Sequence, residues 1–237
     1  MKVVSADGDP SFADHAASFV MSRVSEKPDL VVTTPTGATP TGLYRRLVEE
    51  HHAGRFSMES ASVFMLDEYV DLVSYPQGSF REYLEQNLGE LVFNETTSMH
   101  MLEPMDDAQQ CARYDVALDL AGGIDVAIIG VGRNGHVGFN EPGGSPEERT
   151  HVVNLAASTI SDNFLDLDAE NRPTTAVTVG LADIRRARAV LMLIAGEPKR
   201  NVARMLVSHR FDRRVPATFL LDHPDLTIIV EAGLLQP

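Results

Sequence analysis

The chain has one cysteine, no long hydrophobic run and few positive charges, and each shortage excludes a class of protein. Cys111 is the only cysteine among 237 residues, so neither an intrachain disulfide nor a cysteine-based metal site is expected. No apolar stretch approaches the roughly 20 residues that cross a bilayer. The first ten residues, MKVVSADGDP, lack the basic region and apolar stretch of a secretory signal. These absences predict a cytoplasmic protein with no membrane contact.

Positive charge is scarce. The chain has 20 Lys and Arg against 34 Asp and Glu, a net charge of −14. Phosphate backbones are bound by clustered Lys and Arg, so nucleic acid is not expected as a partner. A small anion is still compatible with this charge, because a few local donors and a helix N-terminus can hold a phosphate.

The residues that are present suit one ordinary α/β domain over residues 1–237, with 43% hydrophobic residues. Strand-like runs alternate with amphipathic helix-like runs, which predicts an open, doubly wound, mostly parallel, Rossmann-like sheet. The expected strands are Lys2–Ser5, Leu30–Thr34, Ser62–Leu66, Asp125–Gly130, Ala176–Val179, Ala189–Ile194 and Leu226–Val230. The expected helices are Ser11–Val24, Pro40–His51, Ser79–Leu88, Asp107–Leu120, Leu181–Arg185, Lys199–Val207 and Pro216–Leu221.

Three polar segments follow three of these strands. PTGATP comes after Leu30–Thr34, DEY after Ser62–Leu66, and VGRNGHVGFNEP after Asp125–Gly130. In an open doubly wound sheet, ligands bind beyond the carboxyl ends of the strands. We therefore expect these three segments to meet at one rim.

The stretch TTPTGATPTG combines Gly37 with the hydroxyls of Thr36 and Thr39 just before a helix. Backbone N–H groups and hydroxyls in this position form an anion cradle. A tight strand-to-helix turn, with Thr39 as N-cap and Pro40 at the first helical position, explains the same residues equally well. Both interpretations stay open on this segment alone.

Two charged side chains stand at similar strand ends. Asp67 follows an apolar strand, where a partly desolvated carboxylate can act as a general base, although a solvated loop or a cap is the commoner role. Lys199 lies in the first turn of a predicted helix, where the helix dipole disfavours a cation. This conflict favours contact with an anion, and a solvated surface lysine is the alternative.

The segment VGRNGHVGFNEP is the most specific of all. His136 suits proton transfer near neutral pH, and Glu141 could orient the imidazole and fix its tautomer. A lone loop histidine is more often structural, so this interpretation needs support from other segments. No second His or Cys stands at ligand spacing and HExxH is absent, so no metal site is expected.

Together these segments resemble a known family. TTPTGATPTGLY, LDEYV, YPQGSFREYL, GVGRNGHVGFNEPG, RTHVVNL, AVTVGLADI and AGEPKRN stand in the order and spacing of the glucosamine-6-phosphate deaminases. That family shares its fold with 6-phosphogluconolactonases. The likeness runs from about Thr33 to Gly233, and the pairing of LDEY with GHxGFNEP distinguishes it from the lactonases.

The resemblance implies ring opening of an amino-sugar phosphate, proton transfer between C2 and C1, and loss of ammonia, without a cofactor or metal. By position, Asp67 matches the base, His136 the ring-opening acid–base and Glu141 its supporting carboxylate, with Asn134 beside them in the catalytic group. The resemblance implies substrate or phosphate contacts for Thr36, Gly37, Ala38, Thr39, Glu68, Gly135 and Lys199.

The sequence departs from the family pattern at three places. Asn134 stands where many members have an aspartate. Leu165 occupies the position of an arginine that grips the substrate phosphate, so Arg172 or another cation must substitute, or the substrate differs. His151 and Val153 replace basic residues that bind an allosteric sugar phosphate in hexameric members. We therefore expect no such activation, and a monomer or small homo-oligomer.

Two alternatives remain from other readings of the same residues. One is a non-catalytic module that binds or senses sugar phosphates, which the presence of both a base and an acid–base relay disfavours. The other is a 6-phosphogluconolactonase, which LDEY and GFNEP disfavour. The amino-sugar epimer is not determined by the sequence.

Overall fold

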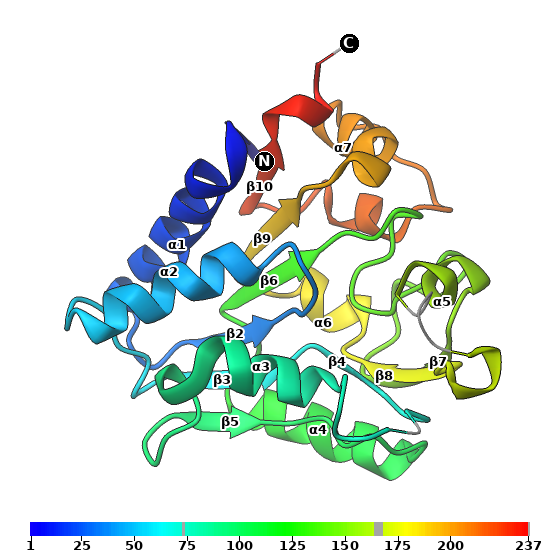
Figure 1. The fold of residues 1–237 in the computed structure, drawn as a ribbon, viewed down its shortest axis with the longest axis horizontal. Helices are drawn as coiled ribbons and strands as arrows, with labels where there is room; N and C mark the ends of the chain where they lie inside the picture. Colours follow the sequence, from blue (N-terminus) through cyan, green and yellow to red (C-terminus); the bar gives the residue numbers. More distant parts are fainter. Residues whose placement is uncertain (73, 164–167, 237) are drawn as a thin grey trace.

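The computed structural model describes residues 1–72, 74–163 and 168–236 and confirms an α/β architecture built on a mostly parallel sheet (Figure 1). The strands are β1 Lys2–Ala6, β2 Val31–Thr34, β3 Ser62–Met65, β4 Asp67–Tyr69, β5 Ser98–His100, β6 Val126–Gly130, β7 His151–Asn154, β8 Thr175–Thr178, β9 Ala189–Ile194 and β10 Leu226–Glu231. The α-helices are α1 Gly8–Glu26, α2 Thr41–His52, α3 Phe80–Leu88, α4 Ala108–Leu120, α5 Ala157–Asn163, α6 Leu181–Arg185 and α7 Arg200–Val207.

Seven strands form the central sheet in the order β1-β10-β9-β6-β2-β3-β5, and every pair within it is parallel. The inner strands read as unbroken apolar runs because helices cover both faces of a parallel sheet. β9, with the sequence AVLMLI, is buried at all six positions. In Figure 1, α1, α2 and α3 lie side by side over the face turned to the viewer, and α4 and α6 lie behind the sheet.

A second, three-stranded sheet in the order β4-β8-β7 stands beside the first, and its pairs are antiparallel. The expected strand Ala176–Val179 belongs here, as β8, and not to the central sheet. The DEY segment, expected as a strand-end loop, forms β4 by pairing with β8. β4, β5 and β7 were not among the expected strands, because they are only three or four residues long and partly polar.

Two expected helix details are wrong. Thr39 is not the N-cap of α2, because the helix begins at Thr41 and its N-cap is Pro40; the Thr39 hydroxyl accepts a hydrogen bond from Lys199. The segment expected as the helix Pro216–Leu221 is a 3₁₀ helix, Pro216–Leu220, with Pro216 in its first turn. Within the described ranges, no helix is long and apolar enough to cross a membrane.

Candidate active site

The three polar segments do meet at one rim, as expected. β6, β2 and β3 are neighbours in the central sheet, and β9 lies on the far side of β6. Since all four strands run parallel, their carboxyl ends lie at the same edge. The rim therefore collects the loop after β2, the start of β4, the loop after β6 and the segment that leads from β9 to Lys199.

His136 is held in the loop after β6 by its neighbours in the chain. Its backbone N–H donates to the side-chain oxygen of Asn134 at 3.0 Å. Its ring lies directly over Gly132, where an added Cβ would come within 2.3 Å of Nε2, so only glycine leaves room for the imidazole. Asn134 and Gly132, both in the same loop, thus hold the His136 ring against the loop backbone.

The Nδ1 side of His136 faces two oxygen atoms. Glu141 Oε2 lies 3.5 Å from Nδ1, and the hydroxyl of Thr159 lies 3.3 Å from it. The Thr159 hydroxyl donates its only proton to Glu141 Oε1 at 2.5 Å, so its oxygen is an acceptor toward the ring. This pair of acceptors assigns the proton to Nδ1 of the neutral ring and leaves Nε2 to exchange protons with a ligand.

Glu141 is buried and remains ionised. Burial opposes the charge, but hydrogen bonds from His136, Thr159 and Asn134 outweigh it and lower the pKa of Glu141 from 4.5 to about 2. Asn134 donates to Oε2 at 2.8 Å. The carboxylate can therefore stabilise a protonated His136, which is the arrangement that an acid–base relay requires.

Asp67 is the second buried carboxylate of the rim. It begins β4 and is 5% exposed. Burial, together with the charge of Glu68, raises its pKa well above the usual value. Oδ2 lies against the loop after β6, 3.4 Å from the position of a Cβ added to Gly138. A desolvated carboxylate is a stronger base than a hydrated one, so Asp67 suits proton abstraction.

Glu68, expected among the substrate contacts, has another task in this structure. Its carboxylate is fully buried and accepts hydrogen bonds from the backbone N–H groups of Tyr69, Phe80 and Arg81. Two of those groups open α3, where unpaired N–H groups and the helix dipole favour a negative charge. Glu68 therefore fixes the start of α3 to the strand that carries Asp67.

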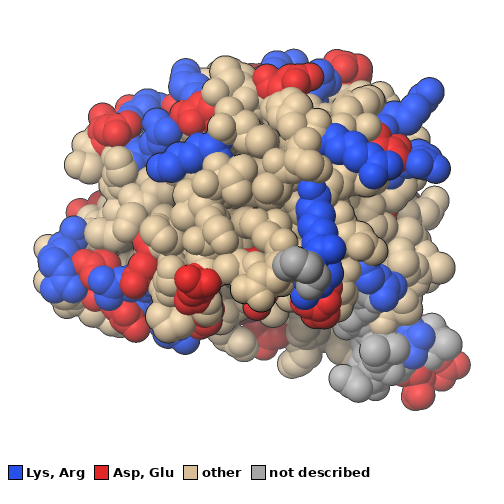
Figure 2. Space-filling model, turned by 90° about the horizontal axis from the view of Figure 1, so that it is seen from above, with Lys and Arg blue, Asp and Glu red and all other residues tan. Residues whose placement is uncertain are grey.

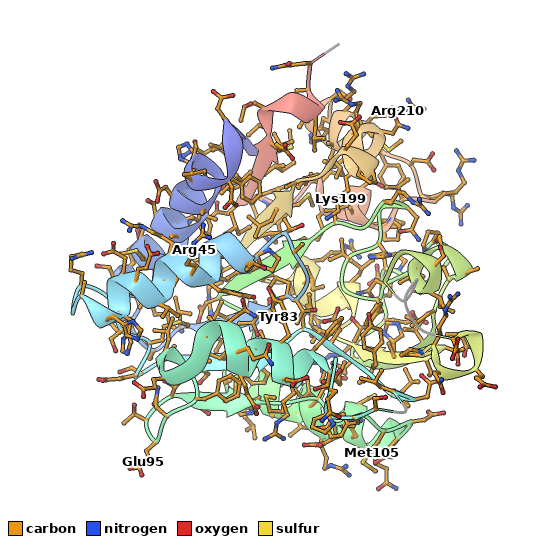
Figure 3. All side chains as sticks on the ribbon, viewed as in Figure 1. Arg45, Tyr83, Glu95, Met105, Lys199 and Arg210 are labelled. Atoms are coloured by element: carbon orange, nitrogen blue, oxygen red, sulfur yellow. The ribbon has the colours of Figure 1, made fainter. Side chains whose placement is uncertain are left out.

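The loop after β2, residues 35–40, is braced from two sides (Figure 3). Lys199 Nζ donates to the Thr39 hydroxyl at 3.0 Å, and the Tyr83 hydroxyl of α3 donates to the Gly37 carbonyl at 2.7 Å. Gly37 has φ of +92°, a conformation that favours glycine. Burial lowers the pKa of Lys199, because the charged ammonium is partly removed from water. A bound anion would stabilise that ammonium.

The other expected binding residues divide into two groups. In the 35–40 loop, Thr36 is half-buried and Ala38 is exposed. Gly135 is buried, and its carbonyl accepts from Ala217 while Val215 packs against it, so it joins the rim to the 3₁₀ helix. Leu165, the position of the missing arginine, lies outside the described residues.

Sequence reasoning missed two residues that support the site. Thr159 and Tyr83 act through contacts with Glu141 and Gly37, which lie 18 and 46 positions away in the chain. Both are on helices, α5 and α3, and the sequence shows only ordinary helix residues there. No local pattern identifies them, since their roles arise from how the helices pack on the rim.

Other hollows in the described parts of the chain lack this chemistry. A cavity of about 440 Å³ lies between α1 and β10, and Arg23 in its lining pairs with Asp225 at 2.7 Å. A second, of about 370 Å³, lies behind Glu141 and is lined by His151 and Val153. In the part of the chain that the structure describes, no group of three His, Cys, Asp or Glu side chains could hold a metal ion.

Known proteins are similar to this chain in sequence over nearly its whole length. The model of the family described as glucosamine-6-phosphate isomerases/6-phosphogluconolactonase matches residues 9–228. The glucosamine-6-phosphate deaminase of Thermoanaerobacter pseudethanolicus is 35% identical over all of this chain and 96% of its own length. That of Lysinibacillus sphaericus is 34% identical over 97% of this chain and 98% of its own.

Solved structures agree. A monomeric glucosamine-6-phosphate deaminase superposes with a TM-score of 0.91 at 31% identity, over 99% of both chains. The 6-phosphogluconolactonase of Trypanosoma brucei superposes with a TM-score of 0.75 at 16% identity over 98% of this chain and 97% of its own, which shows a shared fold only. With the family model covering nearly the whole chain and full-length relatives at this identity, the protein belongs to the glucosamine-6-phosphate isomerase/6-phosphogluconolactonase family.

Proposed function

We propose that the protein converts glucosamine 6-phosphate and water into fructose 6-phosphate and ammonia. One observation carries the proposal: a desolvated carboxylate, Asp67, stands at the same rim as a hydrogen-bonded pair of His136 and Glu141. Moving a proton between adjacent carbons needs one base, and opening a sugar ring needs a second group that both takes and gives a proton. The rim supplies both, from the segments that follow β3 and β6, the two strands on either side of β2.

The proposed sequence begins with the phosphate. Lys199 and the N–H groups of the 35–40 loop hold it, which uses binding energy remote from the reacting carbons to place them. Nε2 of His136 takes the proton of the anomeric hydroxyl and returns a proton to the ring oxygen, which opens the ring. Glu141 stabilises the imidazolium between these two transfers.

Asp67 then acts on the open chain. Its carboxylate removes the proton from C2 and delivers it to C1, and a second proton passes from the amino nitrogen to O1, so the aldehyde becomes a ketose imine with nitrogen still bound at C2. Water adds at C2, the carbon–nitrogen bond breaks, and ammonia leaves with fructose 6-phosphate. A well-placed acid or base contributes about 10²–10⁴-fold to such steps.

The test is ammonia and fructose 6-phosphate release from glucosamine 6-phosphate by the wild type and by Asp67→Asn. We expect turnover by the wild type and at least about a 10²-fold loss in the variant, since the amide cannot take the C2 proton. Asp14→Asn, which alters an exposed side chain on α1, is the matched control. Hydrolysis of 6-phosphogluconolactone with no ammonia release would identify a lactonase instead, and saturable binding without any product would identify a sensing module.

We further propose that the protein works in the cytoplasm as a monomer or small homo-oligomer, with no nucleic acid partner. Its proposed substrate is a phosphorylated sugar, a charged molecule that membranes retain inside the cell, and a relative of the same fold and length is monomeric. Activity that fractionates with the soluble cell extract, unchanged by nuclease, is the expected result.

A further inference from the structure

The hydroxyl of Thr34 is an unusual group for the inside of a protein. Thr34 ends β2, is 3% exposed, and its Oγ1 has no hydrogen-bond partner among the residues that the structure describes. Oδ1 of Asp67 is in the same condition. Buried polar groups are almost always paired, so two unpaired oxygens at adjacent strand ends of one rim require an explanation.

The chain brings these two groups close together. Thr34 pairs with Met65 in the sheet, and its carbonyl accepts from the N–H of Leu66 at 3.3 Å, so the backbone that leads into Asp67 runs beside Thr34. The hydroxyl of Tyr44 donates to the carbonyl of Pro35, the residue after Thr34. The pKa of Tyr44 is raised chiefly by burial and then by the charges of Tyr83 and Asp67.

The preceding residue, Thr33, provides a comparison within the same strand, because its buried hydroxyl does have a hydrogen-bond partner. Successive side chains of a strand point to opposite faces. The Thr33 hydroxyl donates to the carbonyl of Ile128 at 3.3 Å, and Thr33 is as fully buried as Thr34. The two threonines thus share residue type, strand and burial, and differ in whether the protein supplies a partner.

The group that would satisfy both unpaired oxygens must be polar and must donate a hydrogen bond to a carboxylate. A sugar hydroxyl or amino group does this, and it also exchanges a second hydrogen bond with a threonine hydroxyl. Leaving such a hydroxyl unpaired in the free protein is costly, and a polar ligand recovers that cost on binding.

We propose that Thr34 is a further substrate-binding residue. Its hydroxyl forms a hydrogen bond with a polar group of the sugar, beside the carbon from which Asp67 removes the proton. This inference rests on the proposed function and adds to it a contact at the reacting end of the sugar, distinct from the phosphate contacts of Lys199 and the 35–40 loop.

The experiment compares Thr34→Val with Thr33→Val in the full-length protein. We expect Thr34→Val to lower kcat/KM for glucosamine 6-phosphate roughly tenfold while its Tm rises by about 2–4 °C, because a costly unpaired hydroxyl is removed. Thr33→Val should do the reverse, with kcat/KM within about twofold and Tm lower by about 2–4 °C, because a satisfied hydrogen bond is lost. Thr34→Ser, which keeps the hydroxyl, should restore kcat/KM.

A merely structural Thr34 would give other results. Unchanged kcat/KM in Thr34→Val, or a fall in Tm as large as that of Thr33→Val, would overturn the inference while wild-type turnover kept the proposed function intact. If the wild type binds glucosamine 6-phosphate without turning it over, the proposed function fails, and calorimetric binding by the same variants decides the role of Thr34. Absence of binding as well as turnover would overturn both.

Discussion

Asp67 and Glu141 are buried carboxylates at the same rim of the sheet, and their surroundings move their pKa values in opposite directions. Burial and the charge of Glu68 raise the pKa of Asp67, whereas hydrogen bonds from His136, Thr159 and Asn134 overcome burial and lower that of Glu141 to about 2. Pairs of titratable groups separated in this way divide the roles of base and charge stabiliser. The stability of the protein should therefore depend on pH in opposite ways through these two carboxylates.

Replacing Asp67 should stabilise the fold although it lowers the activity. Because its pKa is raised in the folded state, the ionised form destabilises the fold at neutral pH, and protonation removes that penalty as the pH falls. Asp67→Asn is therefore expected to raise Tm at pH 7.5, with the difference from wild type shrinking toward acid pH. Wild-type kcat/KM should fall as the pH drops through the raised pKa. Differential scanning calorimetry and a pH–rate profile measure both, and a Tm lowered at pH 7.5 would contradict the prediction.

Glu141 should behave in the opposite way. Its pKa is lowered from 4.5 to about 2, so its contribution to stability is complete above pH 4.5 and is lost as the pH falls toward 2. The shift corresponds to about 3 kcal/mol. Glu141→Gln should reduce the free energy of unfolding by an amount of this order at pH 7, and by progressively less below pH 4.5. Urea titrations at several pH values test this, and a deficit that is constant with pH would contradict it.

At the scale of elements, α3 joins the two halves of the rim. Its first N–H groups are held by Glu68 next to Asp67, and Tyr83, one turn on, reaches the carbonyl of Gly37 and the hydroxyl of Thr41. Figure 3 shows Tyr83 and Lys199 on either side of the 35–40 loop. The helix therefore sets the distance between the base and the loop proposed to hold the phosphate.

Tyr83→Phe should weaken substrate binding more than it slows turnover. The variant loses a 2.7 Å hydrogen bond to Gly37, an interaction worth about 1 kcal/mol, so the 35–40 loop is less well held and KM should rise roughly 3- to 10-fold with kcat near the wild-type value. Inhibition by inorganic phosphate should weaken in parallel. Tyr75→Phe, on the exposed loop before α3, is the control, and a fall in kcat without a change in KM would disprove this role.

The strands that form the rim could be predicted from the sequence, and the small sheet could not. β2, β3, β6 and β9 are apolar runs followed by unusual polar segments, and both features are local. β4 exists because Asp67 pairs with Thr178, 111 residues later, a register that no local pattern encodes. The same limit applies to Thr39, whose hydroxyl accepts a hydrogen bond from Lys199, a residue far away in the chain. The catalytic candidates could be predicted because their residue types suit the chemistry. The residues that support them could not, because those contacts arise from tertiary packing.

At the scale of the whole molecule, the surface carries charge of both signs despite the net charge of −14. On the face that Figure 2 shows, Lys and Arg are interspersed with Asp and Glu, and no broad area of a single sign is visible. Among the described residues, few large apolar side chains are exposed, and two of them, Val116 and Leu120, lie one turn apart on α4. Two side chains cover far less than the roughly 800 Å² per partner of a stable interface.

This surface predicts a monomer with uncooperative kinetics. Light scattering or sedimentation at micromolar concentration should give a mass of about 25.9 kDa, since few large apolar side chains of the described residues are exposed to form a dimer interface. Initial rates should follow a hyperbola in glucosamine 6-phosphate, because cooperativity between identical sites needs coupled subunits. Leu120→Lys on α4, which would break any association through that helix, should leave both mass and rate unchanged. A mass that is a multiple of 25.9 kDa and falls to one chain in Leu120→Lys would instead identify α4 as an interface.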